Sequence, residues 1–382
     1  MDLVRQEIIS NAKLVVIKVG TRVLTTPEGL LNLEQVASLS EQMNWLIQQG
    51  RQVVLVSSGA VGAGMSHLGI TKRPADLAKL QAVAAIGQTK LMEAYDRFLS
   101  RQHQRSVGQV LLTAEDLTDR SRYLNVRNTL FSLLEMGAVP IINENDTVAV
   151  DELQTTFGDN DRLAALVTNL LRASLLIILS DVDGLYDGHP SDAASNRITT
   201  VTEINAKILS FAAGHQVGLS KGGMSSKLKA AQTVTSAGEN VILASGRTAD
   251  VIKKIFQQAP IGTTFLAQGK SVSPFKRWLG FSAQVKGKLI LDTGASTAVA
   301  TKGKSLLAIG VTQITGEFAK GDVVAVCDAA GHEIARGLTN YTSSDLAKII
   351  GHRSADIAEI LGHLPYDEVI HRDNMFVIGN GA

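Results

Sequence analysis

The sequence predicts an α/β protein: a three-layer αβα sandwich around a mainly parallel sheet, followed by a small β-barrel-like module. Over the first two-thirds of the chain, short runs rich in β-branched residues alternate with longer helical patterns. The short runs are continuously apolar, which is typical of parallel strands covered by helices on both faces. From about residue 262 onward, short strand-like pieces are separated by Gly, Lys and Asp turns at regular spacing, a pattern that suits a small barrel.

Each apolar run is bounded by polar or turn residues and predicts one strand. A helix is predicted over 33–49, because Asn32 stands in an N-cap position, Gln35 follows three residues later and Gly50 lies just past the end. A second long helix is predicted over about 76–102. The predicted strands are 13–19, 52–58, 106–112, 138–143, 174–180 and 240–245.

These patterns divide the chain into three parts. Residues 1–262 are expected to form the sheet domain, 263–280 a linker, and 281–382 the β-rich module with a C-terminal extension. In open parallel sheets, ligands bind beyond the carboxyl ends of the strands. We therefore expect the functional site at that edge of the first domain.

Composition excludes several classes of protein. The 382-residue chain carries 37 Lys and Arg against 36 Asp and Glu, so its net charge does not call for nucleic acid or an anionic membrane. Its one cysteine, Cys327, lies in an apolar run and suggests ordinary burial. The first residues lack the unbroken apolar core of a signal peptide, and no apolar run approaches the length of a membrane span. We expect a cytoplasmic globular protein with no membrane partner.

Familiar phosphate- and metal-binding motifs are missing. Each Gly-Lys-Ser triplet lacks the glycine that a P-loop needs five residues earlier, where Thr264 and Ala298 stand. The glycine-rich stretch 59–64 misses the register of a dinucleotide-binding motif. The histidines show no metal-ligand spacing, so the sequence predicts no metal site built from protein ligands.

The densest polar cluster is 143–161, "NENDTVAVDELQTTFGDND". It holds six carboxylates and three asparagines, and it stands between a predicted strand and a predicted helix. Such a cluster is either a solvated loop or a binding site. Unusual residues also directly follow other predicted strands, namely Gly20, Ser58 with Gly59, and Asp181. Their shared placement at the ligand-binding edge favours a site.

Two lysines stand beside glycine turns. Lys18 interrupts an apolar strand just before Gly20, and a buried lysine is rare unless it is paired. The segment "KGGMSSK" places Gly222 and Gly223 before a helix that carries Lys227, and backbone N–H groups at a helix start favour anions. Taken singly, these segments also suit an edge-strand lysine, a flexible loop or an ordinary turn.

Taken together, the segments resemble the amino-acid kinase family, and within it the branch that phosphorylates L-glutamate. The resemblance covers essentially the whole chain, and the C-terminal module looks like a PUA domain. The pair "INENDTV" and "FGDND" is specific to that branch, whereas related kinases of acetylglutamate, aspartate, carbamate or UMP share only the lysines and glycine turns. In the family's order, the segments are "VIKVGTRVL", "VSSGAVGAG", "YLNVRNTLFSLLEMGAVPIINENDTVAVDEL", "FGDNDRLAALV", "SDVDGLYDGHP" and "KGGMSSK".

The resemblance implies transfer of the γ-phosphoryl group of ATP to the side-chain carboxylate of L-glutamate. The product would be L-glutamyl 5-phosphate, in the first step of proline biosynthesis from glutamate. The implied catalytic residues are Lys18, Lys227 and Asp161, with the aspartate between the two lysines.

Other positions are implied to bind the substrates. Glutamate would be held by Ser58, Asp146 and Asn160, and the backbone N–H groups of Gly20 and Gly59 would contact phosphate oxygens. The residues implied to bind ATP are Lys18, Ser180, Asp181, Lys221, Gly222, Gly223, Met224, Ser225, Ser226 and Lys227.

The resemblance also implies Mg²⁺, held mainly by ATP and water. Proline is implied as a feedback inhibitor, because it shares the α-amino acid head of glutamate, and a homo-oligomer (a dimer or tetramer) is expected. Three residues depart from the family's usual pattern: Arg22 stands in place of serine, and Ser180 and Lys221 each stand in place of threonine.

Two other interpretations stay open. The first is another kinase that forms an acyl phosphate, acting on aspartate or acetylglutamate. The second is an RNA-binding protein that acts through its C-terminal module. From Lys276 onward, however, that region has 11 Lys and Arg against 11 Asp and Glu, so it lacks the positive excess that phosphate binding favours.

Overall fold

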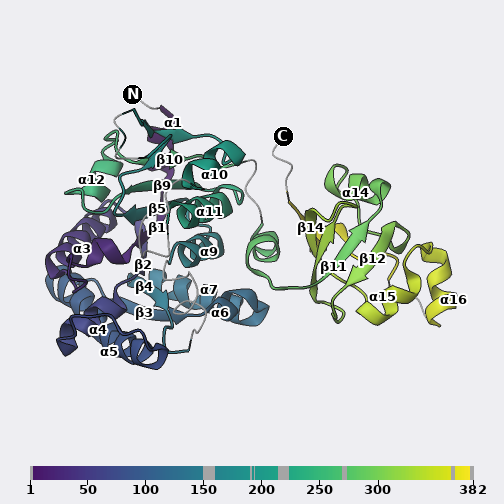
Figure 1. Cartoon of the computed structure of the whole chain (residues 1–382), viewed down its shortest axis with the longest axis horizontal. Helices are drawn as coiled ribbons and strands as arrows, with labels where there is room; N and C mark the ends of the chain where they lie inside the picture. Colours follow the sequence, from purple (N-terminus) through teal and green to yellow (C-terminus); the bar gives the residue numbers. More distant parts are fainter. Residues whose placement is uncertain are drawn as a thin grey trace. The chain divides into compact units, whose positions relative to one another are not determined.

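The computed structural model of the chain describes residues 3–148, 160–189, 192, 194–213, 223–268, 273–362 and 366–378. They form two compact units (Figure 1). One comprises Met1–Leu117 and Ser121–Ser271, and the other comprises Thr118–Arg120 and Val272–Ala382. The division falls inside the expected linker, although the first three residues of that linker belong to a strand of the large sheet. The exact domain boundaries stay a prediction.

The large unit is built on a sheet that has eight strands within the described residues. Their order is β3-β4-β2-β1-β5-β9-β10-β8 (Figure 1). All neighbouring pairs from β3 to β9 are parallel, whereas β10 runs antiparallel to β9. The predicted mainly parallel sheet is confirmed. Its strands are β1 (Leu14–Val19), β2 (Gln52–Ser57), β3 (Val107–Leu112), β4 (Val139–Glu144), β5 (Leu175–Ser180), β8 (Thr200–Val201), β9 (Asn240–Ser245) and β10 (Thr263–Phe265).

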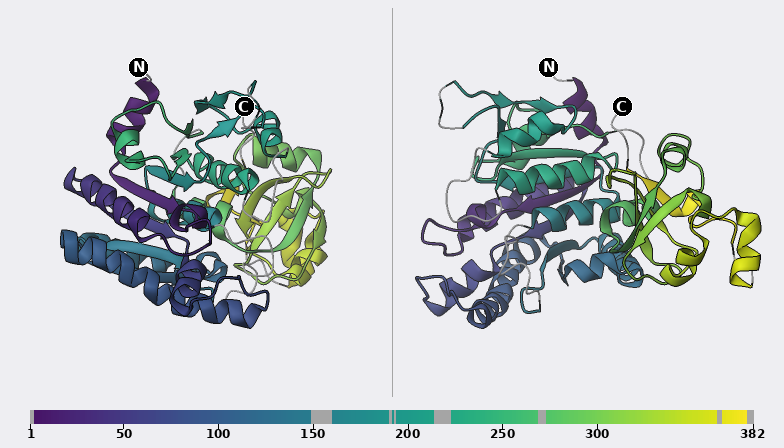
Figure 2. Two further views of the ribbon diagram at one scale, coloured as in Figure 1. Left: turned by 60° about the vertical axis from the view of Figure 1, so that its left-hand side comes forward. Right: turned by 45° about the vertical axis from the view of Figure 1, so that its right-hand side comes forward.

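Helices cover both faces of this sheet and complete the three layers (Figures 1 and 2). On one face, α3, α5 and α12 share a core with Val15, Ile17 and Val19 of β1. On the other face, α9 and α11 pack against each other and against the central strands. Because side chains alternate across a strand, Lys18 points toward the α9 face. The helices of this unit are α1 (Leu3–Asn11), α2 (Thr21–Leu24), α3 (Leu33–Gln48), α4 (Ala60–Leu68), α5 (Leu77–Tyr95), α6 (Ala114–Thr118), α7 (Arg120–Glu135), α9 (Asp161–Leu171), α10 (Ala206–Ala213), α11 (Met224–Thr235) and α12 (Val251–Phe256).

The N-cap predicted at Asn32 is present, and the structure adds a second N-cap at Asp76. The Asn32 side chain accepts a hydrogen bond from the Gln35 backbone N–H at 3.1 Å. The Asp76 side chain likewise accepts from the Lys79 backbone N–H at 2.9 Å. The single helix predicted over 76–102 is α5 followed directly by a π-helical turn, η1 (Asp96–Arg101). Among the described residues, no helix combines the length and apolarity needed to span a bilayer.

The sequence pattern does not predict the shortest strands. A small hairpin of β6 (Leu185–Tyr186) and β7 (Arg197–Ile198) lies outside the main sheet, while β8 and β10 extend that sheet at one edge. Strands of two or three residues are too short to show the period by which a strand is recognised. Backbone pairing and the surrounding structure hold them instead.

The second unit contains a five-stranded sheet within the described residues, in the order β12-β11-β13-β14-β15. The pair β11 and β13 is parallel, and the other neighbouring pairs are antiparallel. Cys327 is buried in β13, as expected. The predicted β-rich module is therefore present. Its elements are α13 (Pro274–Arg277), η2 (Trp278–Ser282), β11 (Val285–Leu291), α14 (Thr293–Ala300), η3 (Ala308–Gly310), β12 (Val311–Thr315), β13 (Val323–Cys327), β14 (Glu333–Leu338), α15 (Ser343–Ile349), η4 (Ser354–Asp356), α16 (Ile357–Leu361), η5 (Arg372–Asn374) and β15 (Met375–Val377).

Two glycines let α4 and α5 cross with their backbones in contact. A Cβ atom on Gly87 would overlap the carbonyl oxygen of Ala60, and one on Gly64 would overlap the carbonyl oxygen of Val83. Helix α4 begins directly after Gly59, at the carboxyl end of β2. The crossing therefore holds α5 close to the edge of the sheet where ligands are expected.

Replacing Gly87 by alanine should lower the free energy of unfolding by about 1–3 kcal/mol, the usual cost of overpacking. The loss should appear although alanine is the better helix former by about 1 kcal/mol. Urea denaturation followed by circular dichroism measures it. The control is Gly223→Ala, because Gly223 has φ −76° and an added Cβ would meet no atom within 4 Å. Equal effects of the two substitutions would contradict the packing argument.

Candidate active site

One buried carboxylate links two lysines from distant parts of the chain. Lys18 Nζ lies 2.6 Å from Asp161 Oδ1, and Lys227 Nζ lies 3.1 Å from Asp161 Oδ2. The side chains of Lys18, Asp161 and Lys227 are 1%, 0% and 8% exposed. The Ser226 hydroxyl also donates to Asp161 Oδ2 at 3.3 Å. The structure brings together the three residues that the resemblance marks as catalytic.

The local structure explains why these three side chains meet. Lys18 is the penultimate residue of β1 and points toward the α9 face of the sheet. Asp161 is the first residue of α9, and Lys227 lies in the first turn of α11, the helix that packs on α9. Burying one of these charges alone would be costly, whereas the carboxylate offsets both ammonium groups. The formal charges of the three groups sum to +1.

The two glycines predicted to contact phosphate stand at the carboxyl ends of β1 and β2. Gly59 has φ +105°, a left-handed conformation that favours glycine, and it caps the start of α4. The Gly20 N–H donates to the carbonyl oxygen of Leu179 at 3.0 Å. Because that donor is already engaged, a phosphate contact from Gly20 requires its N–H to be shared. The contact from Gly59 stays a prediction.

A buried network of amides joins two of the residues implied to bind glutamate. Asn160 Nδ2 donates to Ser58 Oγ at 3.2 Å, to the Ser57 carbonyl oxygen at 2.9 Å and to Asn143 Oδ1 at 2.8 Å. Asn143 Nδ2 in turn donates to Gln88 Oε1 at 2.8 Å. Ser58 and Asn160 therefore lie side by side, and the structure adds Asn143 and Gln88 to them.

The two added residues differ in how visible they are in the sequence. Asn143 belongs to the polar cluster 143–161, so the sequence already indicates it as a candidate site residue. Gln88 lies in the helical stretch "AVAAIGQTKLM", where the only signal is one amide among small and apolar residues. The crossing of α4 and α5 is what brings it to the site.

Asp146 lies in the turn after β4 and has an unusual pKa. Burial, and to a lesser extent the negative charge of Glu144, raise the pKa of this carboxyl to about 6, and the positive charge of Arg73 opposes the rise. A partly buried carboxyl group that titrates near neutral pH is a candidate functional group. The neighbouring acidic residues 151, 152 and 159 of the same cluster lie outside the described residues.

Ser180 and Asp181 mark the carboxyl end of β5. The Ser180 hydroxyl donates to Asp181 Oδ1 at 3.1 Å, and Arg22 donates to Asp181 Oδ2 at 2.8 Å. Burial raises the pKa of Asp181, but the hydrogen bonds from Arg22 and Ser180 outweigh it, so the net pKa lies below the ordinary value. The Arg22 carbonyl oxygen accepts from the Arg247 guanidinium at 3.1 Å. The unusual Arg22 is therefore a close neighbour of two residues implied to bind ATP.

The glycine-rich loop before α11 is only partly covered by the described residues. Lys221 and Gly222 lie outside them. Gly223 caps α11, and Met224, Ser225 and Ser226 form its first turn ahead of Lys227. These residues place the backbone N–H groups of a helix start beside the buried triad of Lys18, Asp161 and Lys227.

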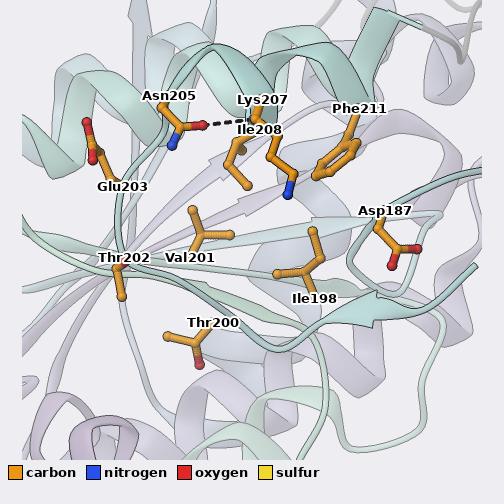
Figure 3. Close-up of a pocket in the computed structure, with 10 residues that line it drawn as sticks. All are labelled: Asp187, Ile198, Thr200, Val201, Thr202, Glu203, Asn205, Lys207, Ile208 and Phe211. Atoms are coloured by element: carbon orange, nitrogen blue, oxygen red, sulfur yellow. Dashed lines mark hydrogen bonds between the residues drawn. The ribbon is translucent and has the colours of Figure 1, made fainter.

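A cavity of about 320 Å³ lies beside α10 (Figure 3). Lys207 and Phe211 project from the helix on one side, and Ile198 and Val201 line the opposite side, from strands β7 and β8 (Figure 3). The dashed line in Figure 3 is the hydrogen bond from the Ile208 backbone to Asn205. None of the residues implied to bind glutamate or ATP lines this cavity.

Comparison with known proteins identifies the families that the two parts of the chain match. Residues 13–245 match the model of the amino acid kinase family, and residues 287–361 match the PUA domain. The chain is 48% identical over 372 residues to a glutamate 5-kinase of Rhodopirellula baltica, an alignment that covers 97% of this chain and 95% of that protein. Glutamate 5-kinases of Syntrophotalea carbinolica (46% over 375 residues, 98% and 99% covered) and of Nostoc sp. (47% over 369 residues, 95% and 96% covered) are similar to the same extent.

The kinase family model spans more than half of the chain, and these relatives align nearly from end to end. The chain therefore belongs to the amino acid kinase family, with a PUA domain after its kinase region.

Proposed function

We propose that this chain is an enzyme that transfers the γ-phosphoryl group of ATP to the side-chain carboxylate of L-glutamate. The product is L-glutamyl 5-phosphate, in the first step of proline biosynthesis from glutamate. The observation that carries the proposal is the buried triad of Lys18, Asp161 and Lys227 at the ligand-binding edge of the sheet. The nearly full-length relatives named glutamate 5-kinase support glutamate as the acceptor.

The chemistry needs positive charge and positioning more than it needs a base. A carboxylate with a pKa of about 4.3 is already ionised at neutral pH. The obstacle is the approach of one anion to another, since like charges about 4 Å apart repel by about 4 kcal/mol at an effective dielectric of about 20. Lys18 and Lys227 would face the transferring phosphoryl group and stabilise the charge on its oxygens. Asp161 would hold the two ammonium groups at a set separation.

The α-amino end of glutamate would lie on the other side of the site. Ionised Asp146 and the Asn160 side chain would accept from its ammonium group, and Ser58 would contribute its hydroxyl. Asn160 Nδ2 already donates to Ser58 Oγ, so these two side chains are oriented before the substrate arrives. Such preorganisation lowers the entropic cost of orienting the substrate.

ATP would lie across the ends of β5 and α11. The start of α11, from Gly223 to Ser226, favours phosphate oxygens through its backbone N–H groups. Ser180 and Asp181 would contact the nucleotide, with the Asp181 charge offset by Arg22. The roles of Lys221 and Gly222 in this loop are proposed from the sequence.

ATP-dependent phosphoryl transfer requires a divalent cation, and we assign Mg²⁺ to this role. When bound with ATP, the cation neutralises charge on the phosphate oxygens. Among the residues that the structure describes, no three His, Cys, Asp or Glu side chains converge to hold a metal ion. As the sequence resemblance implies, we propose that the cation would be held mainly by ATP and water.

Regulation, assembly and location belong to the same proposal. Proline carries the α-ammonium and α-carboxylate groups of glutamate, so it would compete for Asp146 and Asn160 as a feedback inhibitor. A homo-oligomeric state and a cytoplasmic location follow the expectations for this family.

The proposed reaction predicts an acyl phosphate from glutamate. Purified protein with ATP, Mg²⁺ and hydroxylamine should yield a hydroxamate from L-glutamate, and added proline should reduce that yield. L-aspartate and N-acetyl-L-glutamate, tested in parallel, should give no hydroxamate. The acidic turn is proposed to bind a free ammonium group, which N-acetyl-L-glutamate lacks. The side chain of L-aspartate is proposed to be too short to reach the triad. Lys18→Ala is the control for contaminating activity. If another acceptor gave hydroxamate and glutamate did not, the proposal that glutamate is the substrate would be wrong.

Replacing Asp161 by asparagine should destabilise the fold by about 3–5 kcal/mol, because it leaves two buried ammonium groups without their carboxylate. The matched control is Asp181→Asn, whose partner Arg22 is 53% exposed. That pair is worth about 1 kcal/mol or less. Urea denaturation of both variants at pH 7 tests the difference, and similar losses in the two would refute the role given to Asp161.

The affinity for glutamate should fall at low pH because Asp146 must be ionised to accept from the ammonium group. With a pKa of about 6 in the free protein, kcat/KM for glutamate at saturating ATP should be about tenfold lower at pH 5 than its plateau value. Asp146→Asn should give a low and flat profile between pH 5 and 8. An unchanged slope in that variant would assign the titration to another group.

A further inference from the structure

The buried amide network beside Ser58 has two open ends. Gln88, Asn143 and Asn160 are 8%, 3% and 4% exposed, so all three side chains are more than nine-tenths buried. Buried amides normally have partners for both their oxygen and their nitrogen. Within the part of the chain that the structure describes, Gln88 Nε2 and Asn160 Oδ1 are buried and have none.

The hydrogen bonds inside the network fix which way each amide faces. Asn143 Oδ1 accepts from the Glu144 backbone N–H at 2.9 Å and from Asn160 Nδ2 at 2.8 Å. Asn143 Nδ2 must therefore face Gln88, and it donates to Gln88 Oε1. Turning over any of these amides would place nitrogen against nitrogen or oxygen against oxygen. The network thus leaves one donor, at Gln88, and one acceptor, at Asn160.

A donor and an acceptor left open in a buried site match a zwitterion. An amide NH₂ group can only donate, so Gln88 Nε2 needs a hydrogen-bond acceptor such as a carboxylate oxygen. Asn160 Oδ1 can only accept, so it suits an ammonium group. Leaving such buried groups unpaired costs free energy, which a ligand with both groups would recover.

We propose that Gln88 is a substrate-binding residue whose Nε2 donates to the α-carboxylate of the amino acid substrate. This inference rests on the proposed function. Asn143 is held in β4, which is separated from β1 by β2. With neighbouring strands about 4.8 Å apart, the backbone of β4 lies about 10 Å from that of β1, the strand that carries Lys18. The Gln88 end of the network therefore meets the far end of the substrate, while the side-chain carboxylate lies toward the lysines.

The helix crossing described above sets the position of this side chain. Gly87, the residue before Gln88, contacts the backbone of Ala60 at the start of α4. That turn of α4 follows Ser58 and Gly59 directly. Gln88 is thus fixed relative to Ser58 through backbone contact, which is the rigidity that recognition of a small substrate requires.

The test uses ligands that lack one group at a time. Glutarate keeps both carboxylates of glutamate without the ammonium group, and 4-aminobutyrate keeps the ammonium group without the α-carboxylate. In Gln88→Met, which keeps the side-chain length and removes the donor, the KM for L-glutamate and the inhibition constant of glutarate should both rise about tenfold to a hundredfold. The inhibition constant of 4-aminobutyrate and kcat should stay within about threefold of wild type.

A second variant separates recognition from damage to the fold. In Gln88→Glu, one carboxylate oxygen can still accept from Asn143, but the other repels an α-carboxylate. This variant should weaken glutamate and glutarate further and should bind 4-aminobutyrate more tightly than wild type does. Equal weakening of all three ligands in both variants, or an unchanged KM for glutamate, would overturn the proposal.

The two levels of failure are distinguishable. If wild-type protein formed no hydroxamate from glutamate, the proposed function would fail and the Gln88 inference would fall with it. If wild-type protein were active and the ligand pattern above were absent, the Gln88 inference alone would fail. Thermal melts of both variants confirm that each protein is folded when it is tested.

Discussion

The site depends on one buried carboxylate. Lys18 and Lys227 come from a central strand and from a helix far along the chain, and neither ammonium group could stay buried alone at acceptable cost. Asp161 offsets the charge of both ammonium groups, because each of its two carboxylate oxygens contacts one lysine. The geometry leaves little freedom. A shift of Lys18 by one residue along β1 would turn it to the α3 face of the sheet, away from Asp161.

The two ends of the site use different polar groups, and desolvation explains the difference. Charged groups are needed where a phosphoryl group carries charge, and the triad keeps them buried by mutual pairing. Beyond β2, the network consists of neutral amides, which cost less to bury than ions. Amides are also directional, because each has one donating and one accepting end. In the proposed site, such a chain would distinguish the two charged groups of an amino acid by direction, and Asp146 would supply the one negative charge at that end.

Much of the fold and of the triad could be predicted from the sequence because strong local signals mark them. Continuous apolar runs locate the central strands to within one residue at each end, and the Asn32 cap fixes the start of α3. Short pairings such as β6 with β7 carry no such period. The engagement of the Gly20 N–H by Leu179, and the arrival of Gln88 at the site, depend on contacts between distant segments. Local patterns do not encode them.

Arg22 shows how one departure from the family's usual residue fits the physics of the nucleotide site. Asp181 stands at a strand end where a polyphosphate is proposed to bind, and a lone carboxylate there would repel it. The Arg22 guanidinium offsets that charge at 2.8 Å. Because Arg22 is 53% exposed, the pair adds little to folding stability. Its main effect is therefore on the electrostatic potential at the proposed ATP site, which a serine at this position would leave more negative.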